Sequence, residues 1–395
     1  MHGRFWRAKL RSELVRTEMY SLREFGEMIA DKGRFRAYAQ AIAESVRPGD
    51  VVAEIGSGPG VFSLLACRAG ARRVFAIEAD DSIEMARQLA VANGFADRIE
   101  FLQGDSRKLQ LPERANIIVA DIRGTVPLFS SAVESLNDAR ERLLAPGGRL
   151  IPRRDTLMAA LVEAPEFYSR LTSPWQAADG LNLGEAKSHV LHQHHGGVFK
   201  EAELLSSSET WGVLDYAAGA PRGVACPIAF RTKRSGTAHG ICLWFEATLT
   251  ENIRYSSGPG GGSTIYGQLF LPWPEPVPLA EGATVTVQVR ADCIGRDYVW
   301  QWDSQMARDG RQLHFRQSTM EGALFGRANL RRHSAECRPE LSEEGRAHLW
   351  LLSAMDGKMS VGEIAKEASA RFPTLFPTWQ QALEQAIELT TKFSS

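Results

Sequence analysis

Short apolar runs alternate with helical patterns between residues 51 and 144, and few folds accommodate that order. The apolar runs lie at 51–55, 74–78, 99–102 and 117–121, and the helical patterns lie at 60–69, 82–93 and 127–144. Such runs joined by helices are typical of βαβ units, in which helices cover both faces of a parallel sheet. The sequence LAPGG at 144–148 is a stop signal for the last helix. We therefore predict an α/β fold with a doubly wound sheet.

The sequence on either side of this sheet has a different character. Residues 1–47 place apolar side chains at helical spacing, which predicts a helical segment before a sheet domain at 48–153. Between 154 and 330, alternating runs such as ATVTVQVRA are separated by turn clusters such as SSGPGGGS. This pattern predicts antiparallel strands in a barrel or a sandwich. Residues 338–395 predict a small helical module around the turn MDGKM.

Composition excludes several classes of partner for the 395-residue chain. The formal net charge is -1, so no overall field exists to attract nucleic acid or an anionic membrane. The basic clusters at 231–235 and 327–333 are short, which makes nucleic acid a poor candidate. No apolar run reaches the length of a membrane span, and the charged start differs from a signal peptide. We expect a cytoplasmic protein with neither a membrane nor a nucleic-acid partner.

Cysteine and histidine usage gives no sign of a metal site. The five cysteines are scattered and form no C-x-x-C pair, which fits a reducing compartment and argues against a zinc knuckle. The run HVLHQHH contains His189, His192, His194 and His195 but no neighbouring cysteine or acidic ligand. We interpret it as an exposed polar segment and expect no metal.

The glycine-rich sequence EIGSGPG follows the first apolar run and precedes a helix. Gly56, Gly58 and Gly60 permit a tight turn and a close approach of the backbone to a ligand. Glu78 ends the second run, 22 positions after Gly56, where a carboxylate can accept both hydroxyls of a ribose. A merely tight strand-to-helix turn is the alternative interpretation.

The spacing of these glycines discriminates between cofactors. Dinucleotide loops read G-x-G-x-x-G and bind a pyrophosphate, whereas this loop reads G-x-G-x-G and Glu54 precedes it. An acid beside the loop repels phosphate and attracts a ligand that carries an ammonium and a sulfonium. We therefore predict S-adenosylmethionine as the cofactor. Asp105 and Ser106, after the third run, are candidates for its adenine, although Asp105 is equally consistent with a turn.

Residues 19 to about 300 resemble the protein arginine methyltransferases. The segment MIADKGRFRAY is similar to that family's pattern M-x-x-D-x-x-R-x-x-x-Y, with Met28, Asp31, Arg34 and Tyr38 at the matching positions. The resemblance implies a seven-stranded methyltransferase sheet followed by an antiparallel β-barrel. It also implies that Arg34 binds the methionine carboxylate, that Met28 lies against the sulfonium and that Tyr20 lies near the acceptor.

The acceptor side departs from the family's pattern. Where the family has two glutamates in the loop after the fourth strand, ADIRGTVPLFSS has Asp121 at the first position and Ser130 near the second, with Arg123 between them. A pocket with one carboxylate and one guanidinium is near neutral and gives little support to a cationic substrate. In the barrel, Tyr266 ends the sequence TIY that matches a threonine-histidine-tryptophan loop, so the histidine partner of Asp31 is missing.

These residues lead to a functional hypothesis with open alternatives. We expect Asp121 to orient or deprotonate the acceptor, with a helix or turn cap as the alternative role. Arg123 could pair with Asp121 or bind a carboxylate of the substrate. The predicted function is transfer of a methyl group to a nitrogen or oxygen of a small molecule, peptide or protein. The alternatives are a true arginine N-methyltransferase and an inactive scaffold that binds the cofactor.

Two segments predict partners. The sequence SPWQAADGLNLGEAKSHV, with Trp175, occupies the place of the arm through which the arginine methyltransferases dimerise, so the resemblance implies a homodimer. The C-terminal module is similar to the winged-helix-like domains that recognise leader peptides in pyrroloquinoline-quinone-type peptide maturation. That likeness implies a peptide or protein substrate, and a plain helical cap is the alternative.

Overall fold

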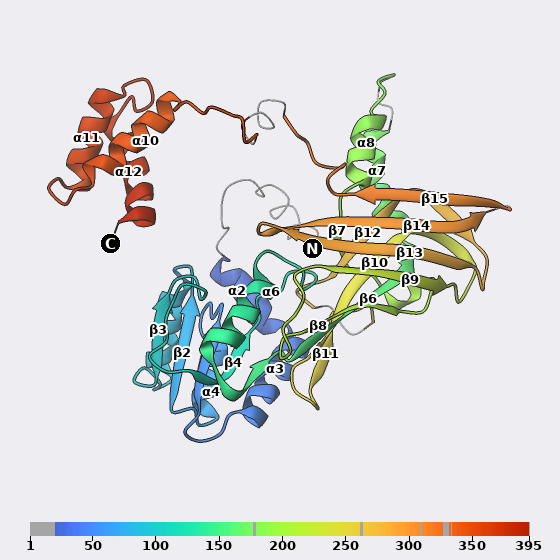
Figure 1. Ribbon diagram of the computed structural model, residues 1–395, viewed down its shortest axis with the longest axis horizontal. Helices are drawn as coiled ribbons and strands as arrows, with labels where there is room; N and C mark the ends of the chain where they lie inside the picture. Colours follow the sequence, from blue (N-terminus) through green and yellow to red (C-terminus); the bar gives the residue numbers. More distant parts are fainter. Residues whose placement is uncertain are drawn as a thin grey trace. The chain divides into compact units, whose positions relative to one another are not determined.

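The structure is a computed structural model that describes residues 20–176, 179–260, 264–308, 310–326, 332 and 334–394. It divides into two compact units, Met1–Ala323 and Leu324–Ser395 (Figure 1). The charged start and most of the basic cluster at 327–333 lie outside the described residues.

A parallel sheet forms the first part of the larger unit. Its strands are β1 (Val51–Ile55), β2 (Arg73–Glu78), β3 (Ile99–Gln103), β4 (Ala115–Ala120) and β5 (Leu144–Ile151). They pair in the order β3-β2-β1-β4-β5, with a change of direction in the order at β1. The predicted runs are thus confirmed as strands, but the sheet has five strands among the described residues. The resemblance implied two further strands in this sheet. The next strand of the chain, β6, follows Pro152 and pairs instead with β10 and β8 of another sheet.

The helices of this part follow the predicted alternation, but the last of them begins later in the sequence than predicted. They are α4 (Val61–Arg68), α5 (Ser82–Ala92), α6 (Ala132–Asp138) and a π-helical turn at Ala139–Leu143. Residues 127–131 were expected to be helical but belong to a loop. Ser130 has a φ of 46°, in the left-handed region, so a right-handed helix cannot pass through it.

Within the described residues, two helices precede the sheet, where the sequence predicts a helical segment. They are α2 (Leu22–Ala30) and α3 (Lys32–Ser45). Ser21 and Glu24 form a capping box at the start of α2, and Asp31 caps α3 by accepting from the backbone N–H of Arg34. Because α3 buries Tyr38 and adjoining apolar residues, it fixes the short α2 next to the glycine loop.

The second part of the larger unit consists of two antiparallel sheets. One has the order β7-β12-β10-β6-β8, with β11 paired to β10, and the other has the order β15-β14-β13-β9. Their bounds are β6 (Arg154–Val162), β7 (His195–Gly197), β8 (Glu209–Asp215), β9 (Val224–Arg231), β10 (Gly236–Thr248), β11 (Arg254–Ser256), β12 (Gln268–Leu279), β13 (Thr284–Ile294), β14 (Asp297–Arg308) and β15 (Arg311–Ser318). The indole N–H groups of Trp273 and Trp302 donate across the interface to Ser304 and Pro272, which joins β12 to β14. The predicted antiparallel strands are therefore confirmed.

The histidine run was expected to be exposed loop, and that prediction is wrong. Residues through Leu191 belong to α8 (Gly184–Leu191), which follows α7 (Pro165–Thr172), and His195 begins β7. His194 packs edge-on against Trp300 with ring centroids 6.0 Å apart, and burial lowers its pKa to about 4. The polar composition gave no sign of this packing because Trp300 lies on a strand distant in the sequence.

Among the described residues of the smaller unit, three helices pack together. They are α10 (Glu343–Ala354), α11 (Val361–Arg371) and α12 (Trp379–Phe393), and they share a core that includes Leu351, Ile364 and Ala386. No strand forms among residues 334–394, so the expected winged-helix-like module lacks a wing. The connection between α11 and α12 contains Pro373 and Pro377, which have no N–H to donate to a strand partner. Among the described residues, no helix combines the length and the apolar character needed to cross a membrane.

Candidate active site

The glycine loop lies at the carboxyl end of β1, as its sequence predicts. Gly56, Gly58 and Gly60 have φ angles of 68°, 50° and 72°, which side chains other than glycine rarely adopt. A Cβ atom on Gly58 would lie 2.5 Å from Cε1 of Phe25 on α2. The loop therefore needs glycine both for its backbone conformation and for the helix that covers it.

Glu78 lies directly beside this loop. Its carboxylate accepts hydrogen bonds from the backbone N–H groups of Gly58 at 2.7 Å and Ala79 at 2.6 Å. Burial raises the pKa of Glu78 above its ordinary value, and these hydrogen bonds oppose the rise. The hydroxyl of Ser57, next in the loop, is buried and has no hydrogen-bond partner among the described residues. The loop thus presents an oriented carboxylate and an unused hydroxyl, two groups that can bind a polar ligand.

Glu54 is placed differently from the prediction. It is buried in the core, where it accepts from the backbone N–H of Ser63 at 2.6 Å and from its hydroxyl at 2.5 Å. Because burial raises its pKa to about 8, the carboxyl is mostly uncharged at neutral pH. Glu54 contacts the first turn of α4 and stabilises the start of that helix. It therefore does not present the full negative charge to the cofactor that the sequence predicts.

Asp105 and Ser106 follow β3 and occupy a turn. Asp105 accepts from Nη2 of Arg107 at 2.7 Å and from the backbone N–H of Arg107 at 3.1 Å. The bonds from Arg107 lower the pKa of Asp105 to about 2. Ser106 is buried, and its carbonyl accepts from Arg142. The turn interpretation of Asp105 is therefore realised in the structure, and its role toward an adenine stays a prediction.

Asp121 lies at the carboxyl end of β4 between two arginines. Nε of Arg34 is 2.5 Å from Oδ2 of Asp121, and Nη1 of Arg123 is 2.9 Å from Oδ1. The hydroxyl of Tyr266 donates to the same carboxylate. Burial alone would raise the pKa of Asp121, but the two guanidinium groups outweigh it and hold that pKa below its ordinary value. Asp121 is thus a buried carboxylate that stays ionised.

Arg123 is held on all sides. It forms a bidentate pair with Asp155, with nitrogen-to-oxygen distances of 2.7 Å and 3.1 Å, and its Nη1 donates to the hydroxyls of Tyr38 and Tyr255. Asp155 is fully buried and also accepts from Tyr216. Of the two roles left open by the sequence, the pairing with Asp121 is the one that forms. Arg123 is not available to bind a substrate carboxylate because its side chain is only 2% exposed.

The sequence at 264–266 brings two of the predicted residues together. Oδ2 of Asp31 accepts from the backbone N–H of Ile265 at 3.1 Å, so a main-chain donor takes the place of the missing histidine. Tyr266 bonds both Asp121 and Arg34. Nη1 of Arg34 donates to the carbonyl of Met28 at 2.8 Å. Together these contacts join α2, α3, the acceptor loop and the antiparallel sheet at one site.

Tyr20 and Ser130 lie at the exposed margin of the site. Tyr20 is 40% exposed, its ring packs edge-on against Phe25, and its pKa is raised by burial and by the negative charges of Glu24 and Asp121. Ser130 is exposed and lies in the acceptor loop. Their roles toward a substrate remain predictions.

Sequence reasoning missed Asp155, Tyr216 and Tyr255 as members of this network. One signal existed for Asp155, since it alternates with Leu157 and Ala159 on the strand β6 and therefore points into the core. An acid at an inward position needs a buried cation. The sequence did not show that this cation is Arg123.

Comparisons with known proteins connect this geometry to methyl transfer. A family model described as ribosomal protein L11 methyltransferase matches residues 37–152. Protein arginine N-methyltransferase 1.1 of Arabidopsis thaliana is 24% identical over 268 residues, which cover 66% of this chain and 69% of that protein. A probable protein arginine N-methyltransferase 6 of the same plant is 33% identical over 255 residues, covering 60% of this chain and 59% of that protein.

Solved structures of low sequence identity share the architecture. The PRMT1 enzyme-prozyme heterotetrameric complex with AdoHcy from Trypanosoma brucei superimposes with a TM-score of 0.71 at 20% identity, covering 74% of this chain and 96% of that one. The fold is that of the arginine methyltransferases. A crystal structure of protein arginine methyltransferase 10 from Arabidopsis thaliana gives a TM-score of 0.66 at 18% identity. With the sequence relatives, these findings confirm the predicted class, a methyltransferase.

Proposed function

We propose that the chain transfers a methyl group from S-adenosylmethionine to a neutral or anionic nitrogen or oxygen nucleophile. The observation that carries the proposal is Asp121, which directly follows β4 and is neutralised by Arg34 and Arg123. The cofactor is supported by the loop and by structural relatives whose names include AdoHcy and SAH.

The residues present fit this cofactor. Glu78 already accepts from Gly58, and an ionised carboxylate retains lone pairs for the two hydroxyls of a ribose. The unpartnered hydroxyl of Ser57 lies in the same loop. Nη2 of Arg34 makes no hydrogen bond to the described residues, so it can bind a carboxylate while Nε remains on Asp121. The carbonyl of Met28 accepts from Nη1 of Arg34, and the place of its thioether beside the sulfonium is part of the proposal.

The cofactor supplies an electrophilic methyl group, and the chain's own residues position the nucleophile. Since the pKa of Asp121 is lowered, its carboxylate is a weak base at neutral pH. Its contribution is therefore orientation and charge stabilisation rather than removal of a proton. Tyr266 stays protonated because burial and Asp121 raise its pKa, so it can donate a hydrogen bond. Asp31 acts behind them by joining α3 to Ile265.

The balance of charges selects the class of acceptor. The ion-paired side chains of the site are Arg34 and Arg123 as cations and Asp121 and Asp155 as anions, and their formal charges sum to zero. A guanidinium that enters this pocket loses its hydration without meeting a net negative charge. A neutral or anionic acceptor avoids that penalty.

Methyl transfer from labelled S-adenosylmethionine tests the proposal with the full chain. One arm offers arginine-containing peptides, and the other offers peptides with histidine, asparagine or carboxylate side chains in the same surroundings. We expect transfer in the second arm, with loss of turnover but retained cofactor binding in Asp121→Asn. Glu84→Gln, an exposed change on α5, is the control and should match the unchanged chain. Efficient methylation of arginine alone would contradict the proposed acceptor class and favour the second candidate.

The second candidate is a protein or peptide arginine N-methyltransferase. It is favoured by one observation, the 33% identity to a protein named as a probable enzyme of that kind. If it holds, removing one of the two cations should strengthen arginine binding. The variant Arg123→Met leaves Asp121 and Asp155 with Arg34 alone, so the ion-paired network has a net negative formal charge, and the KM for an arginine peptide is the measurement, with circular dichroism as the check that the variant folds. Cofactor binding without transfer to any acceptor would support the scaffold alternative.

We also propose a homodimer that forms through the segment between α7 and α8. Trp175 and Leu181 in this segment are 38% and 63% exposed, and large exposed apolar side chains favour a protein partner. Sedimentation velocity should show a dimer, and Leu181→Asp should convert it to a monomer. A dimer that survives both Leu181→Asp and Trp175→Asp would place the interface elsewhere.

The five free cysteines agree with a cytoplasmic location for this protein.

A further inference from the structure

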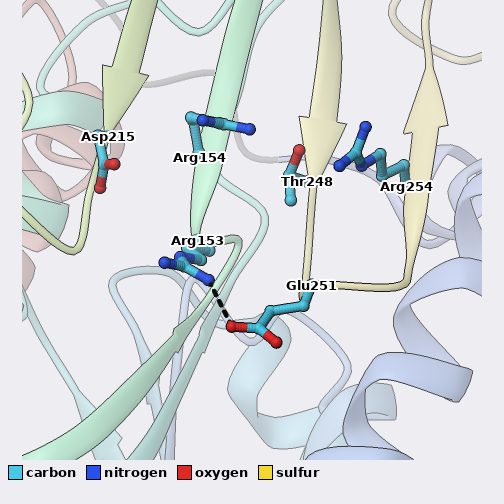
Figure 2. Close-up of a pocket in the computed structure, with 6 residues that line it drawn as sticks. All are labelled: Arg153, Arg154, Asp215, Thr248, Glu251 and Arg254. Atoms are coloured by element: carbon cyan, nitrogen blue, oxygen red, sulfur yellow. Dashed lines mark hydrogen bonds and ion pairs between the residues drawn. The ribbon is translucent and has the colours of Figure 1, made fainter.

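A hollow of about 240 Å³ lies on the outer face of the six-stranded sheet (Figure 2). Its floor is one row of cross-strand neighbours: Asp215 pairs with Arg154, Arg154 with Thr248, and Thr248 with Arg254. Residues directly opposite each other in an antiparallel sheet point to the same side. The row therefore places the hydroxyl of Thr248 between two guanidinium groups, that of Arg154 on one side and that of Arg254 on the other.

The side chains of the two arginines in this row have no partner among the described residues. Neither the Arg154 nor the Arg254 guanidinium forms an ion pair or a hydrogen bond there, and Nε of Arg154 is buried and unsatisfied. A buried donor without an acceptor destabilises the folded chain until a ligand or a water molecule satisfies it. In Figure 2 both guanidinium groups are directed toward Thr248. This geometry leaves several N–H donors converging on one small space.

Two acidic residues that line the hollow have partners other than Arg154 and Arg254. Glu251 pairs with Arg153 at 3.1 Å, and Asp215 accepts from the backbone N–H groups of Ala217 and Ala218. Glu246, two residues before Thr248 on β10, lines an adjoining hollow that shares Arg154, Thr248 and Arg254 with this one. Neither Asp215 nor Glu246 forms an ion pair with these arginines within the described residues, so both guanidinium groups keep N–H donors for an oxyanion.

The reverse side of the same strands carries the Arg123 network. Asp155 follows Arg154 on β6, Tyr255 follows Arg254 on β11, and both side chains bond Arg123 from the inner face. The strand β11 has three residues and pairs only with β10 among the described strands. A ligand that joins Arg154 to Arg254 would therefore fix β6 and β11 relative to each other behind the catalytic site.

We propose that this hollow, formed by Arg154, Thr248 and Arg254, binds a phosphate group. Donors that converge from three directions match a tetrahedral oxyanion with several oxygens better than a planar carboxylate with two. The volume is smaller than that of a typical site for a whole metabolite, about 300–1,000 Å³, so a single oxyanion group fits it. The group is either free phosphate or the phosphoryl group of a phosphorylated side chain.

Calorimetry on the full chain tests the proposal. Sodium phosphate is titrated at constant ionic strength in a buffer without oxyanions, and a phosphoserine peptide and its unphosphorylated form provide the second source. We expect saturable binding in at least one phosphate arm and none for the unphosphorylated peptide. Arg154→Ala and Arg254→Ala should each weaken binding about tenfold or more. Arg154→Lys, which keeps the charge but removes the fork, should have an intermediate effect.

Controls keep the experiment decisive. Arg231→Ala removes an exposed arginine from β9 of the other sheet and should leave phosphate binding unchanged. Hydrogen exchange of the full chain should slow at residues 246–256 when phosphate is added, and the slowing should disappear in Arg254→Ala. Absence of saturable heat in both phosphate arms would overturn the proposal. It would also be overturned by equal weakening in Arg231→Ala or by protection confined to another region.

Discussion

Arg123 is a buried charge whose environment explains both the stability and the chemistry of the site. It pairs with Asp121 on one side and with Asp155 on the other, and the side chains of these acids are only 5% and 0% exposed. Pairing offsets the cost of burying such charges only when every partner is present. Changes at this residue should therefore affect folding as strongly as they affect activity.

Replacement of Arg123 by alanine should destabilise the chain by about 3–5 kcal/mol, because it leaves Asp155 as an unpaired buried anion. The measurement is the free energy of unfolding in denaturant. The double variant Arg123→Met with Asp155→Ala should recover most of that loss, since both charges are removed together. Arg87→Ala breaks an exposed pair with Glu84 and should cost less than about 1 kcal/mol. If the double variant were as unstable as the single one, the pairing argument would fail.

Glu54 should make stability depend on pH. Its pKa is raised from an ordinary value of 4.5 to about 8 in the folded chain, so the folded state holds a proton that the unfolded state releases between these values. Stability is therefore lost as pH rises from about 4.5 to about 8. The neutral variant Glu54→Gln should lack this loss and gain on the order of 2–4 kcal/mol relative to the unchanged chain between pH 5 and pH 8.

Denaturant titrations at pH 5, 6.5 and 8 measure this effect. Glu166→Gln, an exposed change at the start of α7, is the control and should follow the unchanged chain at every pH. Parallel curves for Glu54→Gln and the unchanged chain would show that the carboxyl of Glu54 is ionised in the folded state.

At the scale of elements, the short helix α2 covers the glycine loop through one aromatic contact. Phe25 lies where a Cβ of Gly58 would be, and α2 itself has no fully buried residue. The position of α2, and with it Met28, thus depends on the absence of a side chain at residue 58. Elements held by so few contacts open at low cost.

Gly58→Ala should weaken binding of S-adenosylhomocysteine by about tenfold or more, because the methyl group displaces Phe25 and strains a residue with φ of 50°. Calorimetry measures the affinity. Gly94→Ala imposes a similar strain at φ of 72° with no atom within 4 Å, and it should leave the affinity unchanged. Adding Phe25→Ala to Gly58→Ala should restore part of the binding. No recovery would show that backbone strain alone disrupts the loop.

At the scale of the whole molecule, the chain consists of two units with separate cores. The three C-terminal helices pack on one another through small and aliphatic residues, while the sheets of the larger unit share a different core. The proposed methyl-transfer and phosphate sites lie within the larger unit alone. Its folding and ligand binding should therefore not require the smaller one.

Removal of residues 324–395 should leave a folded protein that binds S-adenosylhomocysteine within about twofold of the full chain. Circular dichroism and calorimetry provide the measurements. Turnover of a peptide acceptor, compared with that of a small acceptor, then reports on the smaller unit. A selective loss with the peptide supports a role in substrate recognition, whereas equal rates support a plain helical cap. Aggregation of the shortened chain would show that the two units depend on each other.

The amino-acid sequence by itself determined the parallel sheet, the glycine loop and the antiparallel strands, because these features depend on local periodicity and on residues with restricted backbone geometry. Gly56, Gly58 and Gly60 and the alternating run of β13 could be interpreted without their neighbours. Only the tertiary structure decided the charges of the site. Asp121 meets Arg34, Arg123 and Tyr266 across 87, 2 and 145 positions of the chain, and Arg123 meets Asp155 across 32. Electrostatic energy depends on distances in space and on burial, and neither follows from the spacing of residues along the chain.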